Sequence, residues 1–217
     1  MDKFVIAILG GTGKEGTGLA LRWAKAGHSI IIGSRENQRA QDSAAELRKI
    51  LDLETITGME NSAAAKAADI CVLTIVANAH RAAIEELKDV LQGKIVVDTT
   101  TRVLFSKPIP PGPPSAARIA QDILGSGAKV VAAYQNVPAS ALRKKLDKPV
   151  NSDVMVCADD MEAVKTVIAL TEDAGMRAYY AGGLDNAFVV EGLTALLIKM
   201  NQHYKGHGTI QIAGLDK

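Results

Sequence analysis

A glycine-rich turn near the start of the chain has the residue types and spacing to bind a phosphate group. The apolar run 4–9 is followed directly by Gly10-Gly11-Thr12-Gly13-Lys14-Glu15-Gly16. A strand that ends in GxGxxG and leads into a helix places unpaired backbone N–H groups, and the positive end of the helix dipole, against a pyrophosphate. Gly11 permits the tight turn, Gly13 lets the backbone approach the phosphate, and Gly16 allows close packing of the helix. The expected dinucleotide contacts are Gly11, Thr12, Gly13, Lys14, Glu15 and Gly16.

The end of the next apolar run, 29–33, indicates which dinucleotide is bound. An NAD site normally has Asp or Glu at this point to bind the ribose 2′-hydroxyl. This chain has Ser34 and Arg35, with Arg39 one helical turn further on. A hydroxyl and guanidinium groups bind a 2′-phosphate, which a carboxylate would repel, so NADP is favoured over NAD. The alternative is that both arginines are ordinary solvated charges beside Glu36.

Polar side chains after three other predicted strands supply candidates for a second ligand. They are Asn78 and His80, Thr100 and Arg102, and Gln135 and Asn136. Residues just past the ends of parallel strands point toward one crevice. The loops contain no Ser/His/Asp set at a nucleophile elbow and no HExxH or CxxC metal spacing, so no metal is expected. Hydride transfer fits such a site, because the cofactors carry the chemistry and the protein aligns them.

Two residues of these loops have side chains that titrate, and each has a structural alternative. His80 is a candidate proton donor because its ordinary pKa is near 6.5. It falls in the first turn of an expected helix, however, where a surface or capping histidine is the stronger expectation. Asp98 ends an apolar strand, where capping of the following loop is at least as strong an expectation as catalysis.

The elements that must position these residues follow from the hydrophobic pattern. Apolar runs of strand length alternate with amphipathic stretches of helix length, which predicts a parallel sheet covered on both faces. The fold class is therefore α/β, a doubly wound, mostly parallel Rossmann sheet with a small C-terminal helical part. Strands are expected near 3–9, 29–33, 54–57, 69–75, 94–98, 129–134, 153–157 and 177–180. Helices are expected near 14–27, 37–51, 60–67, 78–91, 115–125, 139–146, 160–174 and 186–203.

The last part of the chain carries two features beyond this alternation. The helix 186–203 is apolar on most of its circumference and must be buried, by the core, by a dimer partner or as the wall of a substrate cleft. The proline-rich stretch 107–114 should overhang the carboxyl edge of the sheet, or else form a rigid surface linker. The expected organisation is a nucleotide-binding domain over 1–180 and a helical segment over 181–217.

Composition agrees with a cytoplasmic enzyme domain. The chain has 217 residues and a formal net charge of +1, which gives no reason to expect nucleic acid or a membrane as partner. No signal peptide or membrane-spanning segment is expected. Cys71 and Cys157 are expected to be small buried hydrophobes.

The chain resembles the F420-dependent NADP oxidoreductases. The resemblance spans nearly the whole chain and rests on residues 9–20, Ile32-Gly-Ser-Arg35, Val72-Leu-Thr-Ile75, Ser115-Ala-Ala117 and 130–139. It implies a Rossmann enzyme, usually a dimer, that moves hydride between NADPH and the deazaflavin coenzyme F420. It also implies roles for particular residues. NADP would be held by Thr12, Gly13, Ser34, Arg35 and Arg39. The two rings would lie between Thr74, Ile75 and Val76 on one side and the segment from Ala133 to Pro138 on the other, with 205–210 closing the pocket.

Three positions depart from the pattern of that family, and all lie on the acceptor side. They are Val76-Ala-Asn78, Thr99-Thr-Thr-Arg102 and Gln135, where many members have histidine. Arg102 is suited to bind an anionic group of a deazaflavin tail or of another acceptor. Three functions therefore stay open at this point. The chain is an NADPH:F420 oxidoreductase, a reductase of another small-molecule hydride acceptor such as a flavin, pterin or imine, or a non-catalytic NADP sensor.

Overall fold

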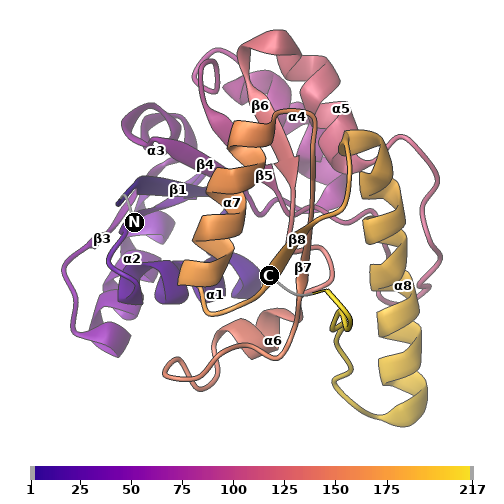
Figure 1. Cartoon of the computed structure of the whole chain (residues 1–217). Coiled ribbons are helices and arrows are strands. Elements are labelled where there is room, and N and C mark those ends of the chain that lie inside the picture. The colour runs from indigo at the N-terminus through magenta and orange to yellow at the C-terminus, as the bar shows by residue number, and fades with distance from the viewer. Residues whose placement is uncertain (1–2, 216–217) are drawn as a thin grey trace.

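The computed structural model describes residues 3–215 and contains an eight-stranded sheet with helices on both faces (Figure 1). The strands are β1 (Val5–Leu9), β2 (Ser29–Ser34), β3 (Ile56–Glu60), β4 (Ile70–Leu73), β5 (Ile95–Asp98), β6 (Lys129–Ala132), β7 (Val154–Ala158) and β8 (Ala178–Tyr180). The helices are α1 (Lys14–Lys25), α2 (Asn37–Leu51), α3 (Asn61–Ala67), α4 (Ala77–Leu87), α5 (Ala116–Leu124), α6 (Ala139–Leu142), α7 (Met161–Asp173) and α8 (Ala187–Tyr204). Every predicted strand and helix is present.

The strands lie in the order β3-β2-β1-β4-β5-β6-β7-β8, and every pair from β3 to β6 is parallel. The order reverses at β1 and β4, which is the position where open α/β sheets bind ligands. This arrangement is the Rossmann fold that the hydrophobic pattern predicts. β7 runs antiparallel to β6, and β8 is parallel to β7. The start of β7 therefore lies at the same sheet edge as the ends of β1, β4, β5 and β6.

Alternate residues of each strand enter two separate cores, one on each face of the sheet. In β1, Ile6 and Ile8 pack with α1 and α7 residues such as Trp23 and Val167. Ala7 and Leu9 instead pack with residues of α3, α4 and α5. Both faces of the sheet are therefore covered, as the near-continuous apolar strands predict. Cys71 and Cys157 are buried and unpaired in this packing, which confirms the expectation for both residues.

Two details differ from the sequence expectations. The sixth helix ends at Leu142, four residues before the predicted end, and Lys145 just beyond it has a φ of 48°, which an α-helix cannot contain. Short 3₁₀ helices at Gly125–Gly127 and Leu184–Asn186 were not expected. The predicted organisation into 1–180 and 181–217 stays a prediction, and residues 1, 2, 216 and 217 of those ranges lie outside the described residues.

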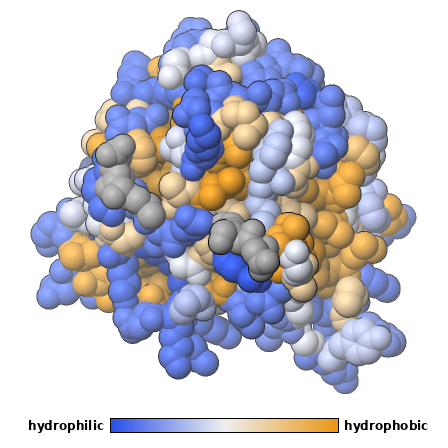
Figure 2. Space-filling view, viewed as in Figure 1, coloured by the Kyte–Doolittle hydropathy of each residue, from blue (hydrophilic) through white to orange (hydrophobic). Residues whose placement is uncertain are grey.

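The final helix, α8, stands beside the sheet and is only partly buried within the chain (Figure 1). Ala187, Val190 and Ala195 are buried, whereas Val189, Leu196 and Met200 are each about half exposed. The expectation that the core of this chain alone buries the whole apolar circumference of the helix is therefore wrong. Orange surface gathers on this side of the molecule (Figure 2). Within residues 3–215, no helix has the length and apolar character needed to cross a membrane.

Candidate functional site

The glycine-rich turn links the end of β1 to the first turn of α1. An added Cβ on Gly11 would lie 2.4 Å from the Ile8 carbonyl oxygen, and one on Gly16 would lie 2.7 Å from the Gly11 backbone. A Cβ on Gly13 would meet no protein atom within 4 Å. Gly11 and Gly16 are therefore required by packing inside the turn, whereas the space beside Gly13 is open. This difference matches the separate roles expected of the three glycines.

A crevice of about 350 Å³ extends from this turn over the ends of β2 and β4. It is lined by most of the residues predicted to bind the dinucleotide: Thr12, Gly13, Ser34, Arg35, Arg39, Thr74, Ile75 and Val76. Both arginines are exposed, and within residues 3–215 neither forms an ion pair. The Ser34 hydroxyl oxygen accepts a hydrogen bond from Glu36 N, so its proton is free to donate. One hydroxyl and two guanidinium groups without an ion pair thus line the end of β2, where the sequence predicts the 2′-phosphate of NADP.

Asn61 is a residue of this crevice that the sequence reasoning missed. Its Oδ1 accepts a hydrogen bond of 3.1 Å from Gly10 N, and its side chain also lies against Gly33. The residue therefore fixes the glycine turn relative to β2. An asparagine at the start of a predicted helix, directly after a predicted strand, is the available sequence signal.

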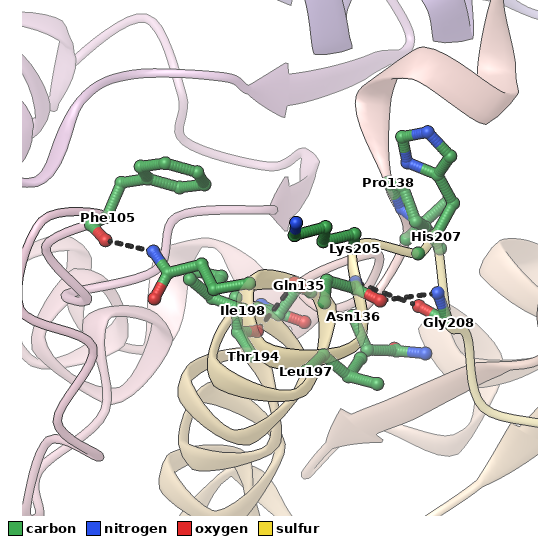
Figure 3. Close-up of a pocket in the computed structure, with 14 residues that line it drawn as sticks. Phe105, Gln135, Asn136, Pro138, Thr194, Leu197, Ile198, Lys205, His207 and Gly208 are labelled. Atoms are coloured by element: carbon green, nitrogen blue, oxygen red, sulfur yellow. Dashed lines mark hydrogen bonds between the residues drawn. The ribbon is translucent and has the colours of Figure 1, made fainter.

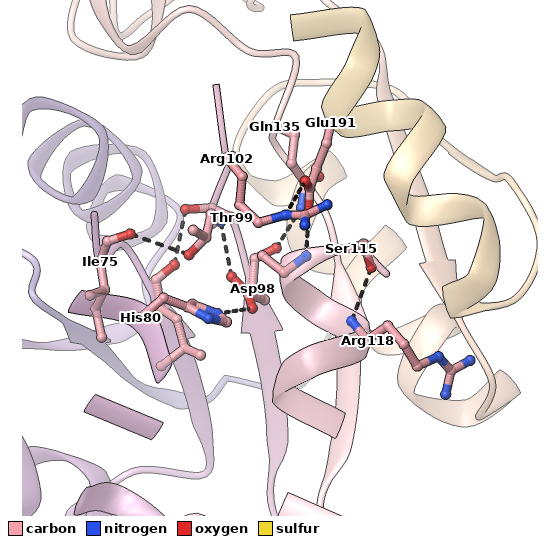
Figure 4. Close-up of polar contacts among 12 residues, drawn as sticks. Ile75, His80, Asp98, Thr99, Arg102, Ser115, Arg118, Gln135 and Glu191 are labelled. Carbon is pink, nitrogen blue, oxygen red and sulfur yellow. Dashed lines mark hydrogen bonds and ion pairs between the residues drawn. The ribbon is translucent and has the colours of Figure 1, made fainter. Parts of the chain in front are cut away.

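The ends of β4, β5 and β6 are connected by a buried polar network (Figure 4). His80 Nε2 lies 2.6 Å from Asp98 Oδ2, and Asp98 Oδ1 accepts a hydrogen bond from Thr100 N. The Thr100 hydroxyl donates to Ile75 O, and the Gln135 amide donates to Asp98 O. Asp98 therefore caps its loop, as expected. A surface or capping His80 is wrong, because the ring is buried and reaches across to β5.

Two further carboxyl groups lie near Asp98. Glu15 in the first turn of α1 is partly buried, and this burial raises its pKa to about 8, although its hydrogen bond with Thr99 opposes the rise. Glu191 of α8 is almost fully buried and accepts hydrogen bonds from Ala116 N and, at 2.9 Å, from Arg102 Nε. Burial also raises the pKa of Glu191, and the Arg102 contact lowers it.

Arg102 joins the proline-rich stretch to α8. Besides its ion pair with Glu191, it donates to Gly112 O at 2.7 Å. Pro110 lies against Gly192 of α8, where an added Cβ would be 3.4 Å away. The stretch 107–114 therefore packs on the final helix rather than running free as a surface linker.

A second, larger cavity of about 510 Å³ lies between α8 and the loop that follows β6 (Figure 3). Its walls are mostly apolar, and they include residues 135–138 of the segment predicted to contact the rings and residues 205–208 of the segment predicted to close the pocket. The other side is made by Phe105, by Thr194, Leu197 and Ile198 of α8, and by Lys205, His207 and the glycines beside them. Concave, mostly apolar sites with a few fixed polar groups are typical of small-molecule binding.

The turn at 205–208 is folded back on α8. Asn201 both accepts a hydrogen bond from Gly208 N and donates one to Gly208 O. Beyond the turn, the carboxylate of Asp153, just before β7, accepts hydrogen bonds from Ile212 N and from the Arg177 guanidinium. The backbone N–H of Asp153 donates to Ile210 O. The reversed direction of β7 thus brings Asp153 to the edge where it anchors the cavity wall.

Several predicted site residues line neither hollow. Gly11 and Gly16 build the turn, Ala133 is buried, Lys14 and Asn78 are exposed, and Glu15, His80, Thr100 and Arg102 form the contacts described above. The α8 wall was the main omission among the acceptor-side predictions. Its signal was present as Thr194, Asn201 and Gln202, which recur at helical spacing on a mostly apolar helix.

Comparison with known proteins assigns the chain to one enzyme family. Residues 5–102 match the family model described as NADP oxidoreductase, coenzyme F420-dependent. The F420-dependent NADP reductase of Methanocaldococcus jannaschii is 41% identical over 97% of this chain and 99% of its own length. The chain belongs to the F420-dependent NADP reductase family. The member from Methanothermobacter thermautotrophicus is 36% identical over 90% of this chain and 88% of its own.

Solved structures agree with the fold of the family. A crystal structure of a protein from Arthrobacter sp. FB24 superimposes with a TM-score of 0.82 at 24% identity, covering 97% of this chain and all of its own. NADP-bound pyrroline carboxylate reductase of Plasmodium falciparum superimposes with a TM-score of 0.60 at 15% identity, over 93% of this chain and 67% of its own. The same arrangement of strands and helices therefore occurs in distant proteins.

Proposed function

We propose that the protein transfers hydride between NADPH and coenzyme F420, with NADP in the crevice at Gly13 and the deazaflavin in the cavity beside α8. With both molecules bound, the nicotinamide would supply the hydride and the deazaflavin would accept it together with a proton, and the residues of the crevice and the cavity would hold the two rings. The observation that carries the proposal is the network through Thr100 and Asp98. It connects Ile75 in the crevice with Gln135 in the cavity.

The residues of the crevice fit NADP. The open space beside Gly13 is the space that a Cβ would fill, and the N-terminus of α1 points its free N–H groups there. Arg35 and Arg39 supply positive charge for the 2′-phosphate. The protein's task at this end is to bind and orient the nucleotide.

The residues of the cavity fit a flat, mostly apolar ring system with an anionic tail. Apolar side chains of α8 face Val137 and Pro138 across the hollow, and the basic side chains of Lys205 and His207 also line it. A sensor of NADP alone has no use for a second cavity beside the nicotinamide end. A ring held against these mostly apolar walls would be shielded from water on that side, which would favour hydride transfer over side reactions.

The direct test is turnover. The purified protein is incubated with NADPH and F420, and the absorbance is followed at 340 nm for NADPH and 420 nm for oxidised F420. Simultaneous loss of both bands is expected. Parallel reactions with FMN and FAD distinguish a flavin reductase, and tight NADPH binding without turnover of any acceptor would overturn the proposal.

The exposed side of α8 supports a homodimer as part of the proposal. Val189, Leu193, Leu196 and Met200 follow one another at intervals of three and four residues, which forms a stripe suited to packing against a second helix. A second copy of the chain is the occupant that we propose for this stripe. The cytoplasm is the proposed location, since free buried thiols persist in a reducing compartment.

A further inference from the structure

Phe105 is an exposed aromatic residue at the edge of the acceptor cavity. It stands at the tip of a tight turn that Leu104 and Lys107 close, with Lys107 N donating to Leu104 O at 3.1 Å. Phe105 is 72% exposed and lines the cavity, whereas its neighbour Leu104 is 71% exposed and does not. Single exposed apolar side chains are ordinary on protein surfaces. The feature that calls for an explanation is therefore the position of Phe105 at a cavity.

The turn is fastened to the cavity side of α8. Gln202, which also lines the cavity, donates from its side chain to Phe105 O at 3.0 Å. Nearer to β5, the ion pair between Arg102 and Glu191 holds the same loop against α8. These contacts fix the backbone of the turn and leave the phenyl ring exposed.

A second copy of the chain and a ligand are the two occupants that could cover this ring. Leu196 and Met200 of the proposed dimer stripe do not line the cavity, whereas Leu197 and Gln202 do. The stripe and the cavity thus use different sides of α8. Because Phe105 is bonded to the cavity side, a ligand in the cavity is the favoured occupant.

The chemistry of the lining residues divides such a ligand into two parts. Phe105 lies at one end of the cavity in Figure 3, and His207 lies at the other, with Lys205 between them. The two basic side chains can pair with negative charge, and the exposed Gln202 amide keeps an oxygen that can accept a hydrogen bond. A phenyl ring has no hydrogen-bond donor and offers an apolar face, on which a flat aromatic ring stacks.

We infer that Phe105 binds the hydride acceptor by stacking its phenyl ring on the flat ring of the deazaflavin. The inference rests on the proposed function and names the side chain that contacts the ring rather than the anionic tail. Contact would bury an aromatic side chain that is largely exposed in the free protein, and both the buried apolar area and the stacking stabilise the complex.

Binding of the oxidised ligands tests the inference without turnover. The ligands are F420 and 5-deazariboflavin, which has the ring but no anionic tail, and their dissociation constants are measured by equilibrium dialysis at saturating NADP⁺. F105A should weaken both ligands by at least about fivefold, whereas F105W, which keeps a flat ring, should stay within about twofold of wild type. L104A removes an equally exposed side chain outside the cavity and should change neither constant.

A second measurement reports the contact itself. The chain has one tryptophan, Trp23, which is fully buried, so F105W adds an exposed tryptophan that acrylamide quenches. The quenching constant, measured from fluorescence lifetimes, should fall by at least about half when F420 covers the new indole ring. L104W should show no such protection. The NADP⁺ dissociation constant of each variant reports whether its crevice is intact, and the F105W result decides the question even if F105A fails to fold.

The outcomes separate this inference from the proposed function. If F105A binds F420 as tightly as L104A does, or if F420 leaves the quenching of F105W unchanged, the inference is wrong while the proposed function stands. It is also wrong if 5-deazariboflavin does not bind the wild-type protein, or if F105A weakens F420 alone, since Phe105 would then contact the tail. If wild-type protein with bound NADP⁺ does not bind F420, the proposed function is wrong and the inference fails with it.

Discussion

The Nε2 atom of His80 lies 2.6 Å from Oδ2 of Asp98, and both side chains are buried. Asp98 also positions Thr100 through its other carboxylate oxygen and Gln135 through its backbone oxygen. The histidine lines neither hollow, and it holds Asp98, whose contacts connect the two.

Replacing His80 with alanine should destabilise the protein. Asp98 would lose its buried partner, and loss of one member of a buried pair is unfavourable by about 3–5 kcal/mol. Urea unfolding measures the change, with H203A as the control because His203 is exposed. H80Q, which keeps a donor, should recover part of the loss. Equal stabilities for H80A and H203A would contradict this role.

Replacing Arg35 with alanine should weaken NADPH binding far more than NADH binding. The lost charge-assisted contact to the 2′-phosphate corresponds to roughly 1.5–3 kcal/mol. Titration calorimetry with each nucleotide gives the difference. K49A removes an exposed cation from the last turn of α2, far along that helix from Arg39, and should leave both affinities unchanged. Equal losses for the two nucleotides would place the 2′-phosphate elsewhere.

Valine substitutions at two glycines of the same turn should affect different properties, nucleotide binding for Gly13 and thermal stability for Gly16. G13V should keep the thermal midpoint, because the new side chain meets no protein atom, and should abolish binding of NADPH and NADH. G16V should lower the midpoint, because its Cβ would lie 2.7 Å from the Gly11 backbone. Thermal unfolding with and without nucleotide separates the effects. Normal nucleotide affinity in G13V would remove this turn from the site.

The buried carboxyl group of Glu15 should lower the free energy of unfolding of the nucleotide-free protein as the pH rises from about 4.5 to 8. Its folded pKa of about 8 lies above the ordinary value of 4.5, so within this window unfolding releases a proton. E15Q lacks this proton release and should gain about 1–2 kcal/mol over wild type across the window, since partial exposure moderates the penalty. Urea unfolding at pH 5 and pH 8 tests this. A wild-type to E15Q difference that is constant with pH would exclude the effect.

Charge on the exposed stripe of α8 should separate the proposed dimer. L196E and M200E place a carboxylate on half-exposed apolar positions, which a helix partner would have to bury. Sedimentation velocity should show monomer for these variants and dimer for wild type. I50E, at a similarly exposed position on α2, should remain dimeric. A monomeric wild type would refute the proposal for this stripe.

Much of the fold was accessible from sequence because the signals are local. The alternation of apolar runs and amphipathic stretches gave every strand and helix, and GxGxxG with Ser34 and Arg35 located the crevice. The reversal of β7 was not accessible, because the direction of a strand depends on pairing rather than on its own residues.

The acceptor side was harder to predict because its contacts join distant segments. His80 and Asp98 are eighteen residues apart, and Arg102 and Glu191 are eighty-nine apart. A first-turn histidine looks like a surface residue until the neighbouring strand end is known. Likewise, the polar residues of α8 can be recognised as part of a cavity only when the loop after β6 is known to lie opposite them.

The two hollows are built from different lengths of chain. The crevice uses residues 10–87, whereas the cavity needs residues from Phe105 through Gly208. Because domains are synthesised from the N-terminus, a ribosome-bound chain contains every crevice residue while more than half of the protein is still to be made. The acceptor cavity cannot be complete until the turn at 205–208 has been made, so the two halves of the site become available at well separated stages of synthesis.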